Sequence, residues 1–181
     1  MSIRPDTKDW TWVLEKPCPE CGFEASSLAP DGIGSALRDN ARSWVDEVLP
    51  RADVRKRPDD HTWSALEYAC HVRDVCALYD RRLHRMLDED DPLYENWDQD
   101  ETAVGERYAE QDPAQVLGQL SEGAEQLAAS FDSVSGDQWQ RPGRRSDGAV
   151  FTIDTFSRYL LHDIVHHGWD VTGVEAGEAA E

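Results

Sequence analysis

The chain has 181 residues, a length that fits one domain with its own hydrophobic core. Hydrophobic residues make up 39% and charged residues 30% of it, which is typical of a globular protein and argues against a disordered chain. The formal net charge of −19 argues against nucleic-acid or anionic-membrane binding, because such a surface repels phosphate groups.

No apolar run approaches the roughly 20 residues that span a bilayer. The first ten residues are polar and lack the apolar stretch of a signal peptide. We therefore expect a cytoplasmic protein without a membrane segment. In that compartment thiols stay reduced, so the four cysteines are better interpreted as thiols or metal ligands than as a disulfide framework.

Four helices are predicted after an irregular segment of residues 1–30 that is rich in Pro, Trp and Cys. Apolar residues recur at helical spacing in each of them. The second helix opens on the capping-box spacing of Ser64 and Glu67, and the third on Asp112-Pro113. The four ranges are Ile33–Leu49, Trp63–Asp88, Asp112–Phe131 and Thr152–Val171.

Strand signals are weak throughout, so the expected fold class is all-α, a four-helix bundle over residues 31–173 followed by a flexible tail, 174–181. The acidic link Glu89–Gln111 is long enough to be functional and has a short helical pattern near Glu101–Tyr108. The last helix is apolar on most sides. We expect the bundle core to cover one side, and a dimer partner or the N-terminal segment to cover the other.

A histidine pair in the last helix is the strongest local signal for chemistry. His162 and His166 are four residues apart, so they project side by side and can chelate one ion. His167 lies about 100° around the helix and is not expected to share that site. His71 is the natural third ligand, because it sits beside the apolar stripe of another long helix. The same spacing also occurs in half-buried histidines that bind nothing.

Cys18 and Cys21 form half of a zinc-ribbon signature whose second CxxC is missing. Cys70 and Cys76 lie six apart on one helix and point about 240° apart, so a four-cysteine zinc site is not expected. Three interpretations of Cys18 and Cys21 stay open. They are reduced thiols in a turn, a redox pair, or part of a mixed metal site with one helix cysteine or a histidine.

Further residues are candidates to support the three histidines or to contact a substrate. Carboxylates three or four residues away are candidates to orient the imidazoles, although each is also typical of a solvated side chain. These are Glu67, Asp74 and Asp170. The candidates to contact a substrate are Arg158, Trp97 and Tyr159, together with the arginines of Arg141–Arg145. Each of them is also compatible with an ordinary surface or packing role.

At these residues the sequence resembles the DinB/YfiT-like family. The segment Trp63–His71 resembles that family's first metal motif, a Trp-Ser start with a histidine eight residues later. The segment Leu161–Gly168 is similar to its second motif, a histidine pair four apart followed by a small residue. The resemblance spans about Ile33–Val171. Residues 1–30 and Trp169-Asp170 depart from the pattern.

The resemblance implies a four-helix bundle with one divalent metal ion, commonly zinc or nickel, held by His71, His162 and His166. It also implies frequent homodimers. Several relatives are metal-dependent transferases of low-molecular-weight thiols such as bacillithiol or mycothiol, and one related group performs thiol-dependent isomerisation.

Three functions are compatible with these residues and with the resemblance. The first is a metal-dependent transfer of a low-molecular-weight thiol to an electrophilic small molecule, since a metal stabilises thiolate over thiol. The second is metal-dependent hydrolysis or isomerisation without a thiol cofactor. The third is a non-catalytic stress-response module whose metal is structural.

Overall fold

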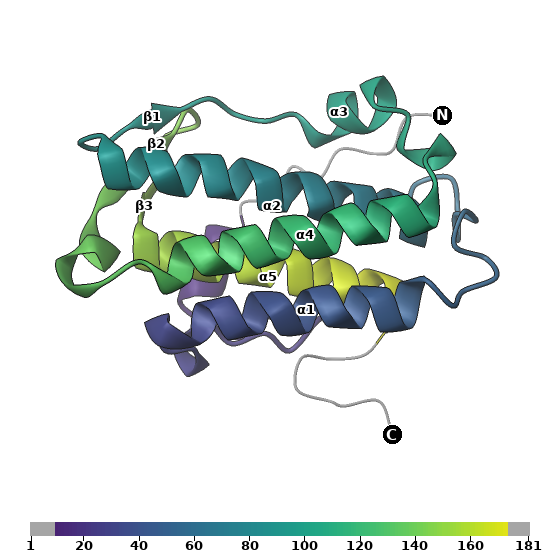
Figure 1. The fold of residues 1–181 in the computed structure, drawn as a ribbon, viewed down its shortest axis with the longest axis horizontal. Coiled ribbons are helices and arrows are strands. Elements are labelled where there is room, and N and C mark those ends of the chain that lie inside the picture. The colour runs from purple at the N-terminus through teal and green to yellow at the C-terminus, as the bar shows by residue number, and fades with distance from the viewer. Residues whose placement is uncertain (1–9, 174–181) are drawn as a thin grey trace.

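The structure, a computed structural model, describes residues 10–173, and a four-helix bundle dominates it (Figure 1). The expected fold class is confirmed, and the helix bounds differ from the predicted ones by at most two residues at any end. The predicted tail, 174–181, lies outside the described residues. The four long helices are α1 (Ile33–Val48), α2 (Ala65–Asp88), α4 (Pro113–Asp132) and α5 (Ile153–Thr172).

Helix ends form where the side chains satisfy free backbone groups. At the start of α2 the Ser64 hydroxyl accepts the Glu67 N–H, while the Glu67 carboxylate accepts the Ser64 N–H at 2.9 Å. The Thr152 hydroxyl accepts the Thr155 N–H at the start of α5 in the same way. The C-terminal end of α5 is Gly173, whose φ of +71° is the left-handed conformation that glycine adopts easily. These caps explain why the predicted bounds hold.

The helices do not follow one another around the bundle in chain order. α4 packs against both α1 and α2, and α5 also packs against both, so α1 and α2 lie diagonally opposite. The connection between α1 and α2 therefore crosses the end of the bundle. As a result α5 lies next to α2, which brings the two histidine-bearing helices together.

A small sheet at one end of the bundle was not predicted (Figure 1). Strand β1 (Leu93–Tyr94) pairs in parallel with β2 (Pro142–Arg145), and β2 pairs antiparallel with β3 (Val150–Thr152). These strands are short, and β2 contains Pro, Gly and two Arg, which are poor strand signals. A Cβ on Gly143 would lie 2.8 Å from Met86, so glycine lets β2 pack closely against α2.

The link between α2 and α4 contains a short helix, α3 (Gln99–Gly105), close to the predicted position. After it, Tyr108 is fully buried, and its hydroxyl donates a hydrogen bond to the Asp74 carboxylate on α2. This contact holds the link against the bundle, so that its residues form one wall of the site described below.

The N-terminal segment packs on the bundle through three short 3₁₀ turns, Thr11–Leu14, Ala25–Ser27 and Pro30–Gly32. It lies against the outer side of α5 (purple in Figure 1). Val13 and Phe23 are buried there. The N-terminal segment thus packs on the side of α5 that faces away from the bundle core, as one of the two expected alternatives. None of the helices within residues 10–173 is both long and apolar enough to cross a membrane.

Candidate metal centres beside a cavity

Within the described residues, two groups of side chains that could bind a metal ion meet on α5, and in each group the candidate ligand atoms lie within 4.8 Å of one another. The first group, called here the triad, joins α2 to α5 and consists of His71, Asp163 and His167. The second, called here the Cys–His cluster, joins the N-terminal segment to α5 and consists of Cys18, Cys21, His162 and His166.

The three expected ligands are divided between these groups, so the three-histidine site expected from the sequence is not one of them. His162 and His166 stay together, as their spacing requires, but His71 faces Asp163 and His167 instead. The cause is rotation along α5, because successive residues are about 100° apart around a helix. One i, i+4 pair faces the N-terminal segment, and the next pair faces α2. His167, expected to lie outside the site, is the residue that meets His71.

In the triad, the Asp163 carboxylate lies between two imidazoles. Its Oδ2 is 3.6 Å from His71 Nε2, and its Oδ1 is 3.7 Å from His167 Nε2. The two rings meet edge to face, with centroids 4.8 Å apart. Two histidine nitrogens and a carboxylate oxygen thus face one point. They can supply three of the four ligands of a divalent ion bound there.

His71 is buried without a hydrogen-bond partner. It is 1% exposed, and neither ring nitrogen has a hydrogen bond. Trp97 stacks on one face at 5.3 Å between centroids, and Trp63 lies 5.3 Å away. Burial lowers the pKa of His71, so the ring is neutral at pH 7. Buried polar atoms normally have partners, and an unpaired neutral imidazole beside a carboxylate fits a metal ligand.

Asp163 supplies the negative charge of the triad. Burial alone would raise its pKa, but His167 and His71 together lower the pKa to about 2. The group is therefore ionised at any physiological pH. A divalent ion held by the triad keeps a net charge of one positive unit, since the two imidazoles are neutral ligands.

Asp170 orients His167 rather than His166. Its Oδ2 is 3.0 Å from His167 Nδ1, whereas its Oδ1 is 3.9 Å from His166 Nε2. A carboxylate on Nδ1 leaves the opposite nitrogen, Nε2, directed at the triad, as behind many metal-bound histidines. Of the three carboxylates expected to orient the imidazoles, Asp170 is the one placed to do so.

Glu67 and Asp74 have other partners. Glu67 is 3% exposed and forms an ion pair with Arg57 in addition to capping α2. Asp74 accepts hydrogen bonds from Tyr108 and Arg73. Neither has a hydrogen bond to His71 among these partners, and both carboxylates hold the helix and the link in place.

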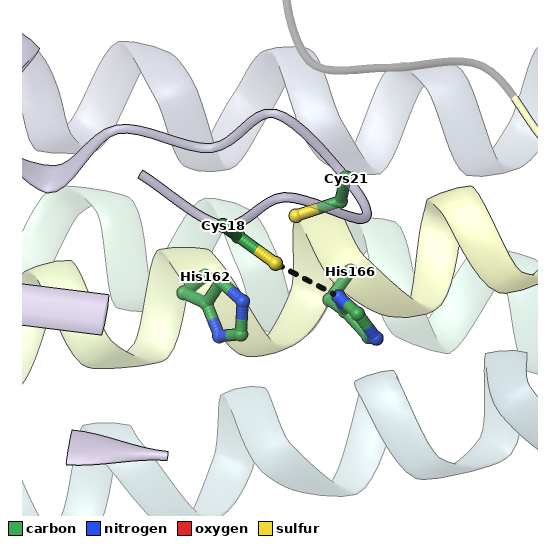
Figure 2. A group of neighbouring side chains, drawn as sticks. All are labelled: Cys18, Cys21, His162 and His166. Atoms are coloured by element: carbon green, nitrogen blue, oxygen red, sulfur yellow. Dashed lines mark hydrogen bonds between the residues drawn. The ribbon is translucent and has the colours of Figure 1, made fainter. Parts of the chain in front are cut away.

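The Cys–His cluster is buried under the N-terminal segment. Its four residues are between 0 and 9% exposed, and Cys18 Sγ lies 3.7 Å from His166 Nδ1 (Figure 2). Burial raises the pKa of Cys21 to about 12 and lowers the pKa of His162 to about 4. Without a bound cation, both groups are therefore neutral at pH 7. Cys70 and Cys76 belong to neither group.

A cavity of about 690 Å³ adjoins both groups and is the candidate substrate site. Asp163 and His167 line it, and His162 and His166 form another part of its wall. Trp97 and Tyr159, expected to contact substrate, line it as well. Further lining residues include Trp10, Trp63, Tyr68, Asp100, Arg145 and Trp169.

Arg158 does not serve the cavity as expected. Its guanidinium pairs with Asp154 and donates to the backbone carbonyls of Ala25 and Leu28, the latter at 2.7 Å. It therefore holds the N-terminal segment on α5. In the arginine cluster, Arg141 donates to backbone carbonyls and Arg144 pairs with Asp91, while Arg145 reaches the cavity and pairs with Asp147 at 2.7 Å.

Asp163, His167 and Asp100 were not predicted as site residues. Asp163 and His167 have the same i, i+4 spacing as His162 and His166, so the sequence pattern alone does not distinguish the two pairs. Asp100 lines the cavity from α3, and burial and the nearby Asp98 raise its pKa. No local sequence signal distinguishes it from the other carboxylates of the acidic link.

Comparisons with known proteins agree with this fold. A sequence profile of the DinB superfamily matches residues 35–169. Among solved structures, YfiT from Bacillus subtilis is similar, with a TM-score of 0.74 and 19% sequence identity over 87% of this chain and 90% of that one. YfiT is described as a probable metal-dependent hydrolase with an unusual four-helix bundle topology. A comparison with curated protein sequences gives no match.

Proposed function

Because the chain belongs to the DinB superfamily, we propose that it is a metal-dependent enzyme whose divalent ion is held by His71, Asp163 and His167. The observation that carries this proposal is the buried His71 ring, which has no hydrogen-bond partner and faces a carboxylate and a second imidazole. The description of YfiT as a probable metal-dependent hydrolase supports the same class of function.

Hydrolysis of a polar small molecule is the reaction that the donor set favours. Two histidines and one carboxylate are the ligand set of several zinc hydrolases, which keep a position open for water or substrate. When bound, the ion supplies Lewis acidity that polarises a carbonyl or phosphoryl group and acidifies water. Zinc fits these ligands, and nickel is the second choice.

The chain's own residues position and protect this centre. Asp170 holds His167 Nδ1 and so directs Nε2 into the triad. Trp97 and Trp63 cover the His71 ring and keep bulk water from it. Asp100, on the cavity wall, has a raised pKa, which suits a group that takes up and returns a proton during hydrolysis.

Thiol transfer to an electrophile is the second candidate, and the size of the cavity favours it. About 690 Å³ is enough for a small thiol and a small electrophile together, whereas hydrolysis needs room for one substrate and water. Trp97 and Tyr159 offer aromatic surfaces for an apolar electrophile. Both candidates require the same triad.

A first experiment tests the triad itself. The metal-free full-length protein is reloaded with zinc and, separately, with nickel. It is then assayed against activated esters and amides without thiol, and against alkylating electrophiles with several cellular thiols. We expect turnover that needs metal. Turnover without thiol identifies a hydrolase, and turnover that requires thiol identifies a transferase.

Substitution of a triad ligand gives the sharper test. His71→Ala and His167→Ala should each lower kcat/KM by at least about 100-fold, since a catalytic metal loses a ligand. His84→Ala is the matched control, because His84 is an exposed histidine of α2 that belongs to neither group. Unchanged activity in His71→Ala would refute the proposal.

A further inference from the structure

Four buried side chains meet where the N-terminal segment crosses α5, outside the triad. Cys18 and Cys21 point from one loop toward His162 and His166 on the helix (Figure 2). We propose that these four residues bind a second, structural zinc ion, which fastens the N-terminal segment to the bundle. This inference does not depend on the proposed catalysis, because the two groups share no ligand.

The separations between the ligand atoms fit tetrahedral zinc. Zn–S bonds of about 2.3 Å and Zn–N bonds of about 2.0 Å place neighbouring ligand atoms roughly 3.3–3.8 Å apart. Cys18 Sγ and His166 Nδ1 are 3.7 Å apart. Every other pair lies within 4.8 Å, so side-chain movements of about 1 Å close the site around an ion.

The loop that carries the cysteines has the backbone of a metal-binding turn. The Cys18 N–H donates to the Phe23 carbonyl at 2.9 Å, and the Gly22 N–H donates to the Cys18 carbonyl at 3.0 Å. Gly22 has φ of +71°, which permits the tight reversal after the second cysteine. The reversal directs both sulfur atoms to the same side, toward α5 (Figure 2). A CxxC spacing of this kind is the common half-site of structural zinc.

The imidazoles present suitable nitrogens. His166 Nδ1 faces Cys18, while its Nε2 lies 3.4 Å from the carboxylate of Glu20, a residue between the two cysteines. A carboxylate on the far nitrogen is the usual support of a zinc-bound histidine. In His162, Nε2 is buried and has no hydrogen-bond partner. Buried polar atoms normally have partners, so an unpaired imidazole in this cluster fits a metal ligand.

The cluster is closed, which distinguishes a structural ion from a catalytic one. The Trp10 ring covers both imidazoles, at 5.4 Å from His162 and 5.0 Å from His166, and Phe23 lies 5.7 Å from His162. The cavity is lined by the two imidazoles but by neither cysteine, so the rings separate the sulfur atoms from it. Four protein ligands leave no position for substrate.

Zinc binding at this site has a defined chemical balance. Two S–H bonds break, two Zn–S bonds form, and two protons pass to the solvent, while the histidines bind as neutral ligands. The two thiolates neutralise the ion, so no net charge is left under the N-terminal segment. The same segment carries Trp10 and Glu20 into the cavity wall, so the ion also determines the shape of that wall.

The test counts metal in the full-length protein. We expect two equivalents of zinc per chain after purification without chelators, one in Cys18→Ser and in Cys21→Ser, and one in His71→Ala. Cys70→Ala is the matched control, because it removes a buried thiol outside both groups and should keep two equivalents. A variant Cys18→Ser that keeps two equivalents would overturn the proposal.

Replacement of zinc by cobalt distinguishes the two sites by their absorption. It also tests the proposal if a cysteine variant fails to fold. In cobalt-loaded wild-type protein and in His71→Ala, we expect intense thiolate-to-cobalt charge-transfer absorption from the Cys–His cluster. Its absence from both proteins overturns the zinc cluster, as does a Cys18–Cys21 disulfide in protein isolated without oxidant. If His71→Ala keeps its full metal content while Cys18→Ser loses one equivalent, the triad fails and the cluster stands.

Discussion

At the scale of single residues, Asp170 decides how the two adjacent histidines on α5 are used. Its carboxylate lies 3.0 Å from His167 Nδ1 and 3.9 Å from His166 Nε2, so it is hydrogen-bonded to the triad and only near the Cys–His cluster. His166 has Glu20 instead, at 3.4 Å. Each imidazole thus has its own carboxylate, and this keeps the two groups chemically separate.

The variant Asp170→Asn should weaken metal binding at the triad by roughly 10–100-fold, because the loss of the carboxylate frees His167 to rotate and makes its nitrogen a poorer ligand. Competition titration with a chromophoric chelator measures the two affinities. The affinity of the Cys–His cluster should change much less. Asp39→Asn, an exposed change on α1, is the control. An equal loss at both groups would contradict this assignment.

At the scale of elements, α2 positions His71 through its N-terminal end. The Glu67 carboxylate caps the helix and also pairs with Arg57, although it is almost fully buried. Burial would raise its pKa, but the hydrogen bonds from Arg57 and Ser64 lower it below the ordinary 4.5. His71 lies one helical turn after Glu67, so the cap fixes the position of His71 along the bundle axis relative to α5.

The variant Glu67→Gln should lower the free energy of unfolding by about 2 kcal/mol at pH 7, because it removes a charged hydrogen-bond partner from a buried site. Urea unfolding followed by circular dichroism measures it. Because the pKa of Glu67 is lower in the folded state, its stabilisation is complete above pH 4.5 and is lost as the pH falls through the lowered pKa. Glu67→Gln should lack this part of the acid dependence. Parallel curves for both proteins would contradict the pairing.

At the scale of the whole molecule, α5 is buried between the bundle and the N-terminal segment. Arg158 holds that segment by donating to the carbonyls of Ala25 and Leu28, and the Cys–His cluster joins it to the helix again one and two turns further on, at His162 and His166. Trp10 and Glu20 of the segment line the cavity. The segment is therefore part of the candidate active site as well as a cover for the helix.

The variant Arg158→Ala should loosen this segment while leaving the bundle folded. Amide hydrogen exchange of residues 10–28 should become about tenfold faster or more, since charged hydrogen bonds are worth roughly 1.5–3 kcal/mol each. Exchange within α2 and α4 should stay unchanged and serves as the internal control. Unaltered protection of residues 10–28 would show that other contacts hold the segment.

The sequence by itself determined the elements. Helical periodicity, the Ser64–Glu67 cap and Asp112-Pro113 gave correct helices, because local spacing and capping act within a few residues. Spacing also identified His162 with His166 and Cys18 with Cys21 as pairs. It did not reveal the strands, since Pro142–Arg145 forms a strand only through partners that are distant in the sequence.

Only the tertiary structure decided which pair faces which neighbour. An apolar helix such as α5 can be rotated about its own axis by about 100° without any change in its local pattern, so the sequence places His162 and Asp163 equally well opposite His71. Packing removes this freedom. α2 lies against the side with Asp163 and His167, and the N-terminal segment covers the side with His162 and His166.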